Sequence, residues 1–526
     1  MTRFASTPLG RAVLRRRHYN VPTLPHHPII GQGRHAVPRT MGLLIALIIT
    51  WSSLVSAQIQ QAWVAKYNNS ITNGNHQALK MALDPTGNIY VLGVSANDNT
   101  NIGYVVVKYA PNGNQIWSAR YDSTNFPTAT PTGFALDSSN AVVVTGNAVT
   151  AKYDASGNQL WTLPYSANGI GMDLGQNAYI TGTSNAFTTI KLNPQGSNVW
   201  TRTFGESQDI SEAIAIDSSS NVFIAGKEIT QSRDAIAANV ATVKYDKDGT
   251  QLWANVTMDG NLDYDVQIPG VALDKADNIY IEENYLGTFV GPYSTDKYSS
   301  DGVGGGYAGN PTQNILSAAS AIALDSVGGI LVTGKNAHQP PLPSYGTYKM
   351  DIQGNYLWTN LYPMSSYGSS GALGIAVDSN DSVYVTGEST ITNTGSDIAT
   401  IKYDSNGKQL WLQRYDGPAH ENDAGNVIAV DNSGNVYVAG YETETNGFTS
   451  MILIKYSLVI GQKQSNGDFI LHASGSPGES FDIQASTNLQ TWQDLGSIIA
   501  DTNGVALFED TNAPLFPARF YYTIPK

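Results

Sequence analysis

Few side chains in this sequence are of the types that carry acid–base or metal chemistry. Four of the eight histidines precede residue 57, and the chain has no Cys. Paired carboxylates can hydrolyse a glycosidic bond, but the sequence does not fix their separation. No Gly-rich phosphate loop or nucleophile elbow is present. The candidates for a ligand-facing surface, chosen because they fall in variable segments between expected strands, are Asp209, Asp234, His338, Tyr345, His420, Glu421 and Asp423.

Tryptophan and aspartate recur at regular intervals. A row of Trp side chains could bind a ligand or stack on a quinone, but a ligand needs such a residue once, so recurrence favours packing. Turns such as DKDG at 246–249 resemble part of a calcium loop, which requires several oxygen ligands. Asp capping its own turn is the simpler explanation, so we expect no cofactor and leave calcium open. The repeated Trp residues are Trp63, Trp117, Trp161, Trp200, Trp253, Trp358 and Trp411.

Two short patterns organise these residues. The first is an apolar strand ending in Asp, then a turn and a second strand, as in IAVDNSGNVYVAG. The second is a strand ending in Lys, then a Gly turn and Trp, as in KYDKDGTQLW, with Lys and Trp nine positions apart in six units. Both patterns predict β-hairpins. The first pattern occurs at Asp84, Asp137, Asp173, Asp217, Asp274, Asp325, Asp378 and Asp431.

Two successive hairpins give four strands, named A to D, in each repeat. A repeat of up to about 50 residues with four strands is typical of a β-propeller blade. The eighth unit lacks strand D, whereas the stretch around Trp63 is a strand D without the rest of its unit. We therefore predict an all-β fold: an eight-bladed propeller over residues 58–460, closed by the N-terminal strand. Two units are short, so seven blades are the alternative.

The loop lengths predict where a ligand would bind. The A–B and C–D turns are nearly constant in length and should form one plain face. The B–C and D–A connections vary, as in 227–239, 335–347 and 414–426. Variable loops on a rigid ring are the usual place for binding.

The first 57 residues differ from the rest. They contain seven Arg and no acidic residue, then the apolar run GLLIALIIT and small residues at Val55 and Ala57. This predicts a signal peptide cleaved after Ala57, with translation from Met1 or Met41. The remaining chain is acidic, which argues against nucleic acid as a partner, and we expect no membrane span in the mature form, a monomer, and secretion or a place in the cell envelope.

The repeats resemble the bacterial β-propeller family called SBBP repeats, in GIAVDSNDSVYVTG at 374–387 and IKYDSNGKQLW at 401–411. The resemblance covers roughly residues 61–458. It implies a secreted or surface propeller, and the family carries no agreed catalytic motif. The fifth unit departs from the pattern, because Gly306 stands where the other units place Trp. We expect that outer strand to be the least regular.

The repeat stops near Ile460. Five strand candidates follow between residues 468 and 525, enough for a small β-sandwich over 461–526. Its expected core residues are Phe481, Trp492, Phe508 and Phe520. The stretches STNLQTW and FPARFYY are similar to small C-terminal modules of secreted bacterial proteins, which implies a cap, a linker or an attachment module.

Two classes of function remain. The first is a non-enzymatic binding or scaffold module that takes a protein or glycan on the variable-loop face. The alternative is a propeller enzyme, either a quinoprotein-like dehydrogenase or a metal-dependent lyase, lactonase or glycosidase. The absent Cys pair opposes the quinoprotein and the scarce His opposes the metal enzyme, so we predict the binding module.

Overall fold

The fold was established from a computed structural model with side chains. The strands described below belong to the unit Ser53–Lys526. Within this described part of the chain, no helix is long and apolar enough to span a bilayer. The structure describes residues 55–525 except 71–72, 97–100, 123–127, 183–186, 232–235, 258–264, 287–289, 308–315, 337–343, 363–369, 391–394, 465, 475–477, 488–490, 503–504 and 517–518.

Local turn chemistry builds the hairpins. The Asp84 Oδ1 accepts the backbone N–H groups of Thr86 and Asn88, at 3.0 and 2.9 Å, while Gly87 takes a φ of +82°. Gly adopts this conformation without steric strain. The expectation that Asp caps its own turn is thus confirmed. The same pair of bonds recurs at Asp137, Asp217, Asp274, Asp325, Asp378 and Asp431.

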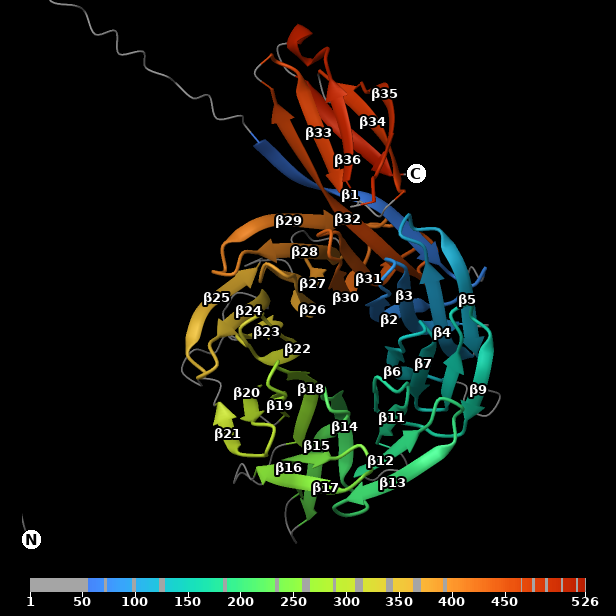
Figure 1. The fold of residues 1–526 in the computed structure, drawn as a ribbon, viewed down its shortest axis with the longest axis vertical. Helices are drawn as coiled ribbons and strands as arrows, with labels where there is room; N and C mark the ends of the chain where they lie inside the picture. The colour runs from blue at the N-terminus through green and yellow to red at the C-terminus, as the bar shows by residue number, and fades with distance from the viewer. Residues whose placement is uncertain are drawn as a thin grey trace, which may run out of the picture. The chain divides into compact units, whose positions relative to one another are not determined.

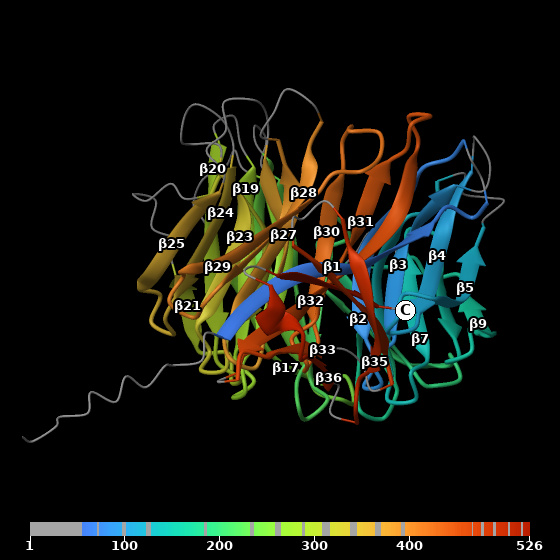
Figure 2. The same ribbon diagram turned by 90° about the horizontal axis from the view of Figure 1, so that it is seen from above.

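The hairpins assemble into eight antiparallel blades, so the eight-blade prediction is confirmed. Figure 1 shows the first strand of each blade nearest the centre of the ring, and Figure 2 shows the strands running between the two faces of the ring. Blades 1 to 4 are β2 (His76–Leu83), β3 (Ile89–Ala96), β4 (Ile102–Tyr109), β5 (Gln115–Tyr121); β6 (Pro131–Leu136), β7 (Val142–Gly146), β8 (Thr150–Tyr153), β9 (Gln159–Leu163); β10 (Gly169–Met172), β11 (Ala178–Thr181), β12 (Phe187–Leu192), β13 (Asn198–Phe204); and β14 (Ile210–Ile216), β15 (Val222–Gln231), β16 (Ile236–Tyr245), β17 (Gln251–Thr257). Blades 5 to 8 are β18 (Asp265–Leu273), β19 (Ile279–Leu286), β20 (Val290–Tyr298), β21 (Gly304–Tyr307); β22 (Ala318–Leu324), β23 (Ile330–Asn336), β24 (Ser344–Met350), β25 (Tyr356–Tyr362); β26 (Gly371–Val377), β27 (Val383–Ser389), β28 (Asp397–Tyr403), β29 (Gln409–Tyr415); and β30 (Ala424–Val430), β31 (Val436–Thr443), β32 (Thr449–Lys463), β1 (Val55–Tyr67).

The N-terminal strand closes the ring. β1 pairs antiparallel with β32, with Trp63 opposite Lys455 and Tyr67 opposite Met451. This supplies the strand D that the eighth unit lacks, as the sequence predicted. The pairing extends to Val55, opposite Gln462, so the expected cleavage point after Ala57 lies within β1. Residues 1–54 of the expected signal peptide lie outside the described residues.

Tryptophan joins neighbouring blades. In six blades the indole N–H of strand D donates to a backbone carbonyl in the C–D turn of the next blade, at 3.0–3.3 Å. Each indole lies against the Gly of that turn; at Gly407, for example, an added Cβ would stand 2.6 Å from the indole of Trp358. These six Trp side chains therefore pack at the junctions between blades. The six donors are Trp63, Trp117, Trp161, Trp200, Trp253 and Trp358.

The fifth blade has the shortest outer strand among the described blades. Its outer strand β21 spans four residues, and Gly306 pairs with Asp296. At the junction with blade 6, three tyrosines pack against one another: the ring of Tyr348 lies 5.6 Å from Tyr293 and 5.2 Å from Tyr356.

The C-terminal segment continues blade 8. All five predicted strands are present: β33 (Phe469–Ser474) and β36 (Val505–Asp510) extend the blade-8 sheet through β32, while β34 (Ser480–Ser486), β35 (Gln493–Ile499) and β37 (Phe520–Pro525) form a second sheet. A 3-10 helix, η2, spans Ala513–Leu515. The expected boundary at 460/461 falls inside β32, which runs unbroken from the propeller into this segment.

The core of the C-terminal segment differs in part from expectation. Phe481 is buried and Phe508 packs against the same cluster. Trp492 was predicted to be a core residue, and this is wrong, because this residue is 39% exposed. It lies just before β35, which is an edge strand of the second sheet. The side chain of Phe520 lies outside the described residues.

Candidate functional site

The loop face of blade 8 carries a cavity with a volume of about 580 Å³. Two segments far apart along the repeat form it: the D–A connection from β29 to β30, and the B–C turn from β31 to β32. Both belong to the class of connection that the sequence predicts for binding. The cavity is lined by Pro418, Ala419, Glu421, Asn422, Thr443, Glu444, Thr445 and Gly447.

Asp423 fastens the two walls of this cavity together. It is fully buried, and its two carboxylate oxygens accept the N–H of Gly417 at 2.6 Å and of Thr443 at 2.9 Å. Burial raises the pKa of Asp423 to about 6, although the two N–H donors favour the charged form. Asp423 therefore shapes the site and does not face a ligand.

Asp209 uses the same device in blade 4. It is also buried, and its carboxylate accepts the N–H of Glu206 at 2.6 Å and of Ile229 at 2.8 Å. A carboxylate that binds the backbone on both sides is a structural bracket. The prediction that Asp209 faces a ligand is wrong for this reason, since both oxygens are committed inside the protein.

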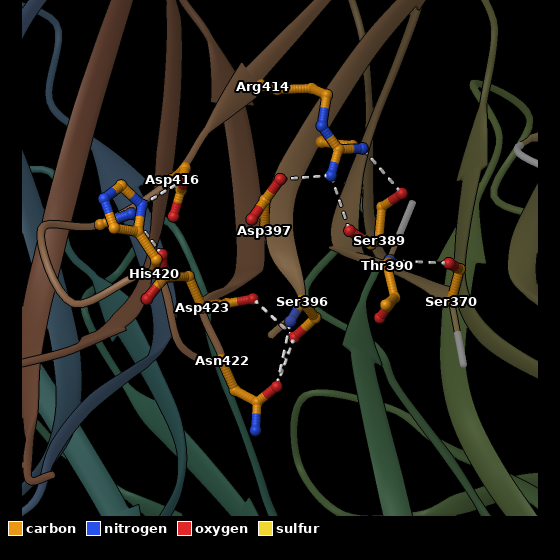
Figure 3. A network of polar contacts seen from close by, with 12 residues as sticks. Ser370, Ser389, Thr390, Ser396, Asp397, Arg414, Asp416, His420, Asn422 and Asp423 are labelled. Atoms are coloured by element: carbon orange, nitrogen blue, oxygen red, sulfur yellow. Dashed lines mark hydrogen bonds and ion pairs between the residues drawn. The ribbon is translucent and has the colours of Figure 1, made fainter. Parts of the chain in front are cut away.

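His420 and Glu421 remain at the surface beside Asp423. The Nδ1 of His420 lies 2.7 Å from the Oδ2 of Asp416, and this hydrogen bond raises the pKa of the imidazole (Figure 3). Glu421 is exposed and lines the cavity. Asn422, also in the lining, accepts the N–H of Ser396 at 3.0 Å. The connection is thus anchored to blade 7 while Glu421 stays accessible.

In three neighbouring blades a cationic side chain joins the outer strand to strand B. Each stands three positions after the Trp of its outer strand. Arg414 in blade 7 donates to the Oγ of Ser389 at 2.9 Å and to its carbonyl at 2.8 Å, and also contacts Asp397 (Figure 3). In blade 1, Arg120 makes the corresponding contacts with Ser95. These clamps join the end of strand B to strand D.

Lys66 is the blade 8 member of this set, and the closing strand β1 contributes it. Lys66 pairs with the buried Glu442, which also accepts the hydroxyl of Tyr415, and lies 3.5 Å from Glu444 in the cavity wall. Burial lowers the pKa of Lys66, but hydrogen bonds and charges from Glu442 and Glu444 outweigh it, so the net shift is upward. Ring closure and cavity shape are therefore coupled.

The other predicted ligand-facing residues do not join this site. Tyr345 was expected in a loop, but it is buried within β24, where its hydroxyl donates to the carbonyl of Ala399 at 3.2 Å. The strand begins at Ser344, inside the segment that was predicted to be a loop. Asp234 and His338 lie outside the described residues. Sequence reasoning missed Glu444 and Lys66, although the spacing of Arg and Lys from Trp was a usable signal.

In the described part of the chain, no group of three or more His, Asp or Glu is placed to hold a metal ion. The turn carboxylates are instead committed to their turns and to lysines, as in the pair Lys152–Asp137 at 2.9 Å. What the cavity offers to a ligand is two carboxylates, an amide and hydroxyl groups on a rigid ring.

The similarity of this chain to known proteins is limited in extent or in sequence identity. No protein-family profile matches the chain. A stretch of 136 residues, 23% of the chain, is 31% identical to an uncharacterized WD repeat-containing protein of Acanthamoeba polyphaga mimivirus, of whose length it spans 10%. Solved structures that match include a Bacteroides caccae protein of unknown function (11% identity, 52% of this chain and 93% of that one, TM-score 0.32), a Xanthomonas campestris gluconolactonase (12%, 60% and 90%, 0.29) and a eukaryotic initiation factor (10%, 86% and 98%, 0.36).

Proposed function

We propose that this chain is a β-propeller binding module without catalytic activity, and that its ligand occupies the blade 8 cavity. The observation that carries the proposal is the 580 Å³ cavity lined by residues from the segments 418–422 and 443–447 on the loop face. Its walls are held by the backbone N–H groups of Gly417 and Thr443, which donate hydrogen bonds to the buried carboxylate of Asp423. A preformed concave site with a few fixed polar groups is what a specific ligand requires.

The lining favours a basic polypeptide segment over other ligands. Glu421 and Glu444 place two carboxylates in the cavity, and hydrogen bonds and the charge of Lys66 outweigh burial to lower the pKa of Glu444. This shift keeps the carboxylate of Glu444 charged at neutral pH. Complementary charge gives specificity and speeds association, so Lys or Arg side chains of a protein partner fit this cavity, and a glycan is the competing ligand.

The cellular setting belongs to the same proposal. We infer that the protein is secreted or held in the cell envelope, on the basis of the basic and apolar N-terminal pattern and the absence of Cys. The resemblance to SBBP repeats supports the same setting. The C-terminal strands would then serve as a small β-sandwich module that presents or attaches the ring.

The test is a peptide array carrying Lys- and Arg-rich segments, followed by titration of the best peptide. We expect Glu421→Gln/Glu444→Gln to weaken binding about tenfold or more and the control Glu509→Gln, at an exposed position on β36, to leave it unchanged. If the peptide binds the double variant as tightly as it binds the Glu509→Gln control, the proposed site is rejected. Binding of a glycan array that depends on the same glutamates would replace the protein ligand by a glycan, and a stoichiometric metal or quinone spectrum would favour an enzyme.

A further inference from the structure

A second cavity lies in the C-terminal segment and has no part in the proposed function above. Its volume is about 220 Å³, and it is formed by the end of β34, the start of β35 and the residues after η2. Two aromatic side chains line it, Trp492 and Phe516, which are 39% and 37% exposed. A large aromatic residue that stays exposed in a wall of a cavity is available to a ligand.

Phe516 is held in place by Arg519, which also lines the cavity. The guanidinium carbon of Arg519 lies 4.3 Å from the centre of the Phe516 ring. The Nε of Arg519 pairs with the Oδ2 of Asp510 at 3.0 Å, both side chains being more than nine-tenths buried, and Asp510 also accepts the hydroxyl of Tyr521 at 2.9 Å. A ring fixed in this way loses little conformational freedom when a ligand binds.

The ion pair also limits the ligand's charge. Because Asp510 neutralises Arg519, the cavity presents no uncompensated charge from this pair, and a small ion has little to gain there. Polar groups nevertheless surround the aromatic rings, since the exposed side chains of Thr487 and Gln493 are part of the lining. The cavity thus combines flat aromatic surface with hydroxyl and amide hydrogen-bonding groups.

This combination matches one class of ligand. A pyranose ring has C–H groups on its faces, which pack against the electron-rich face of an aromatic ring, and hydroxyl groups around its edge. The volume is below the range of about 300–1,000 Å³ typical of larger ligands, so one ring fills it. We propose that this cavity is a saccharide-binding site for a single neutral pyranose residue stacked on Trp492 and Phe516, with Thr487 and Gln493 as hydrogen-bonding partners.

The experiment is calorimetric titration of the full protein with glucose, galactose, mannose, N-acetylglucosamine and glucuronate. At least one neutral sugar should bind, and Trp492→Ala and Phe516→Ala should weaken its binding about tenfold or more. Trp492→Phe, which keeps an aromatic face, should retain most of the affinity. The control Leu507→Ala, at a 58% exposed position on β36, should bind as the unchanged protein does.

Three results would overturn the proposal. These are no binding of any sugar at millimolar concentration, binding that Trp492→Ala leaves unchanged, or a preference for glucuronate. Trp492 is exposed, so the melting curve of its variant should match that of the unchanged protein; this shows that loss of binding reflects the site. Loss of sugar binding with an intact response to basic peptides would separate this site from the blade 8 cavity.

Discussion

A buried ion pair joins the C-terminal segment to the last blade. The Nζ of Lys455 lies 2.8 and 3.0 Å from the two oxygens of Glu479, and both side chains are fully buried. In six other blades the corresponding lysine pairs with the turn Asp of its own blade. Blade 8 has no C–D hairpin, and Glu479 takes over as the partner of its lysine.

Removing one partner should be costly. Glu479→Ala leaves a buried ammonium whose other described neighbours are the carbonyl of Pro111 at 3.3 Å and the ring of Tyr437 at 5.8 Å. Breaking a buried pair in this way costs about 3–5 kcal/mol. Replacing both partners by apolar residues of similar size is often neutral, so Lys455→Met/Glu479→Leu should recover most of the lost stability.

Chemical denaturation followed by circular dichroism measures these changes. The expected order of stability places Glu479→Ala lowest, with the double variant close to the unchanged protein. Glu509→Ala, which removes an exposed carboxylate from the same segment, is the control and should change the midpoint little. The reasoning is refuted if Glu479→Ala unfolds at the same midpoint as the unchanged protein, or if the two substitutions are additive.

Three further predictions follow from the fold. Gly407→Ala should destabilise the ring by more than the backbone strain of about 1–3 kcal/mol, because the added Cβ would clash with the indole of Trp358. Gly434→Ala has a similar φ of +79° and nothing within 4 Å of the added Cβ, so in a urea titration it should cost the strain alone. Burial, and after it the charge of Asp296, raises the pKa of Glu283. Because the folded pKa lies above the unfolded one, the stability that protonated Glu283 contributes is complete in acid and is lost as pH rises through the folded pKa. Asp296→Asn should therefore flatten the decline in melting temperature with pH. Asp423→Ala should make the connection before β30 cleave faster in limited proteolysis, since two N–H groups lose their acceptor; an unchanged digestion rate would show that the bracket is dispensable.

Local chemistry is what made the blades predictable. The Asp and Gly turns are complete within a few residues, and the missing Trp of the eighth unit identified the strand at Trp63 as its replacement. Contacts between distant segments were not predictable, because no local pattern marks them. Lys66 and Glu444 come together because β1 pairs with β32 to close the ring. Glu479, which lies after the last repeat, pairs with Lys455. Trp492 was misplaced because apolarity alone does not distinguish a core aromatic from one at a cavity wall.

Ring closure by β1 is the central claim, since it also places Lys66 beneath the candidate site. The chain has no Cys, so Ala65→Cys/Leu453→Cys, at directly paired positions of β1 and β32, tests it without background. We expect an intramolecular disulfide on mild oxidation, with both thiols lost in the monomer. None should form in Ala65→Cys/Thr400→Cys, which places the second thiol at the same position of blade 7. Free thiols or exclusively intermolecular disulfides in the first variant would contradict ring closure by β1.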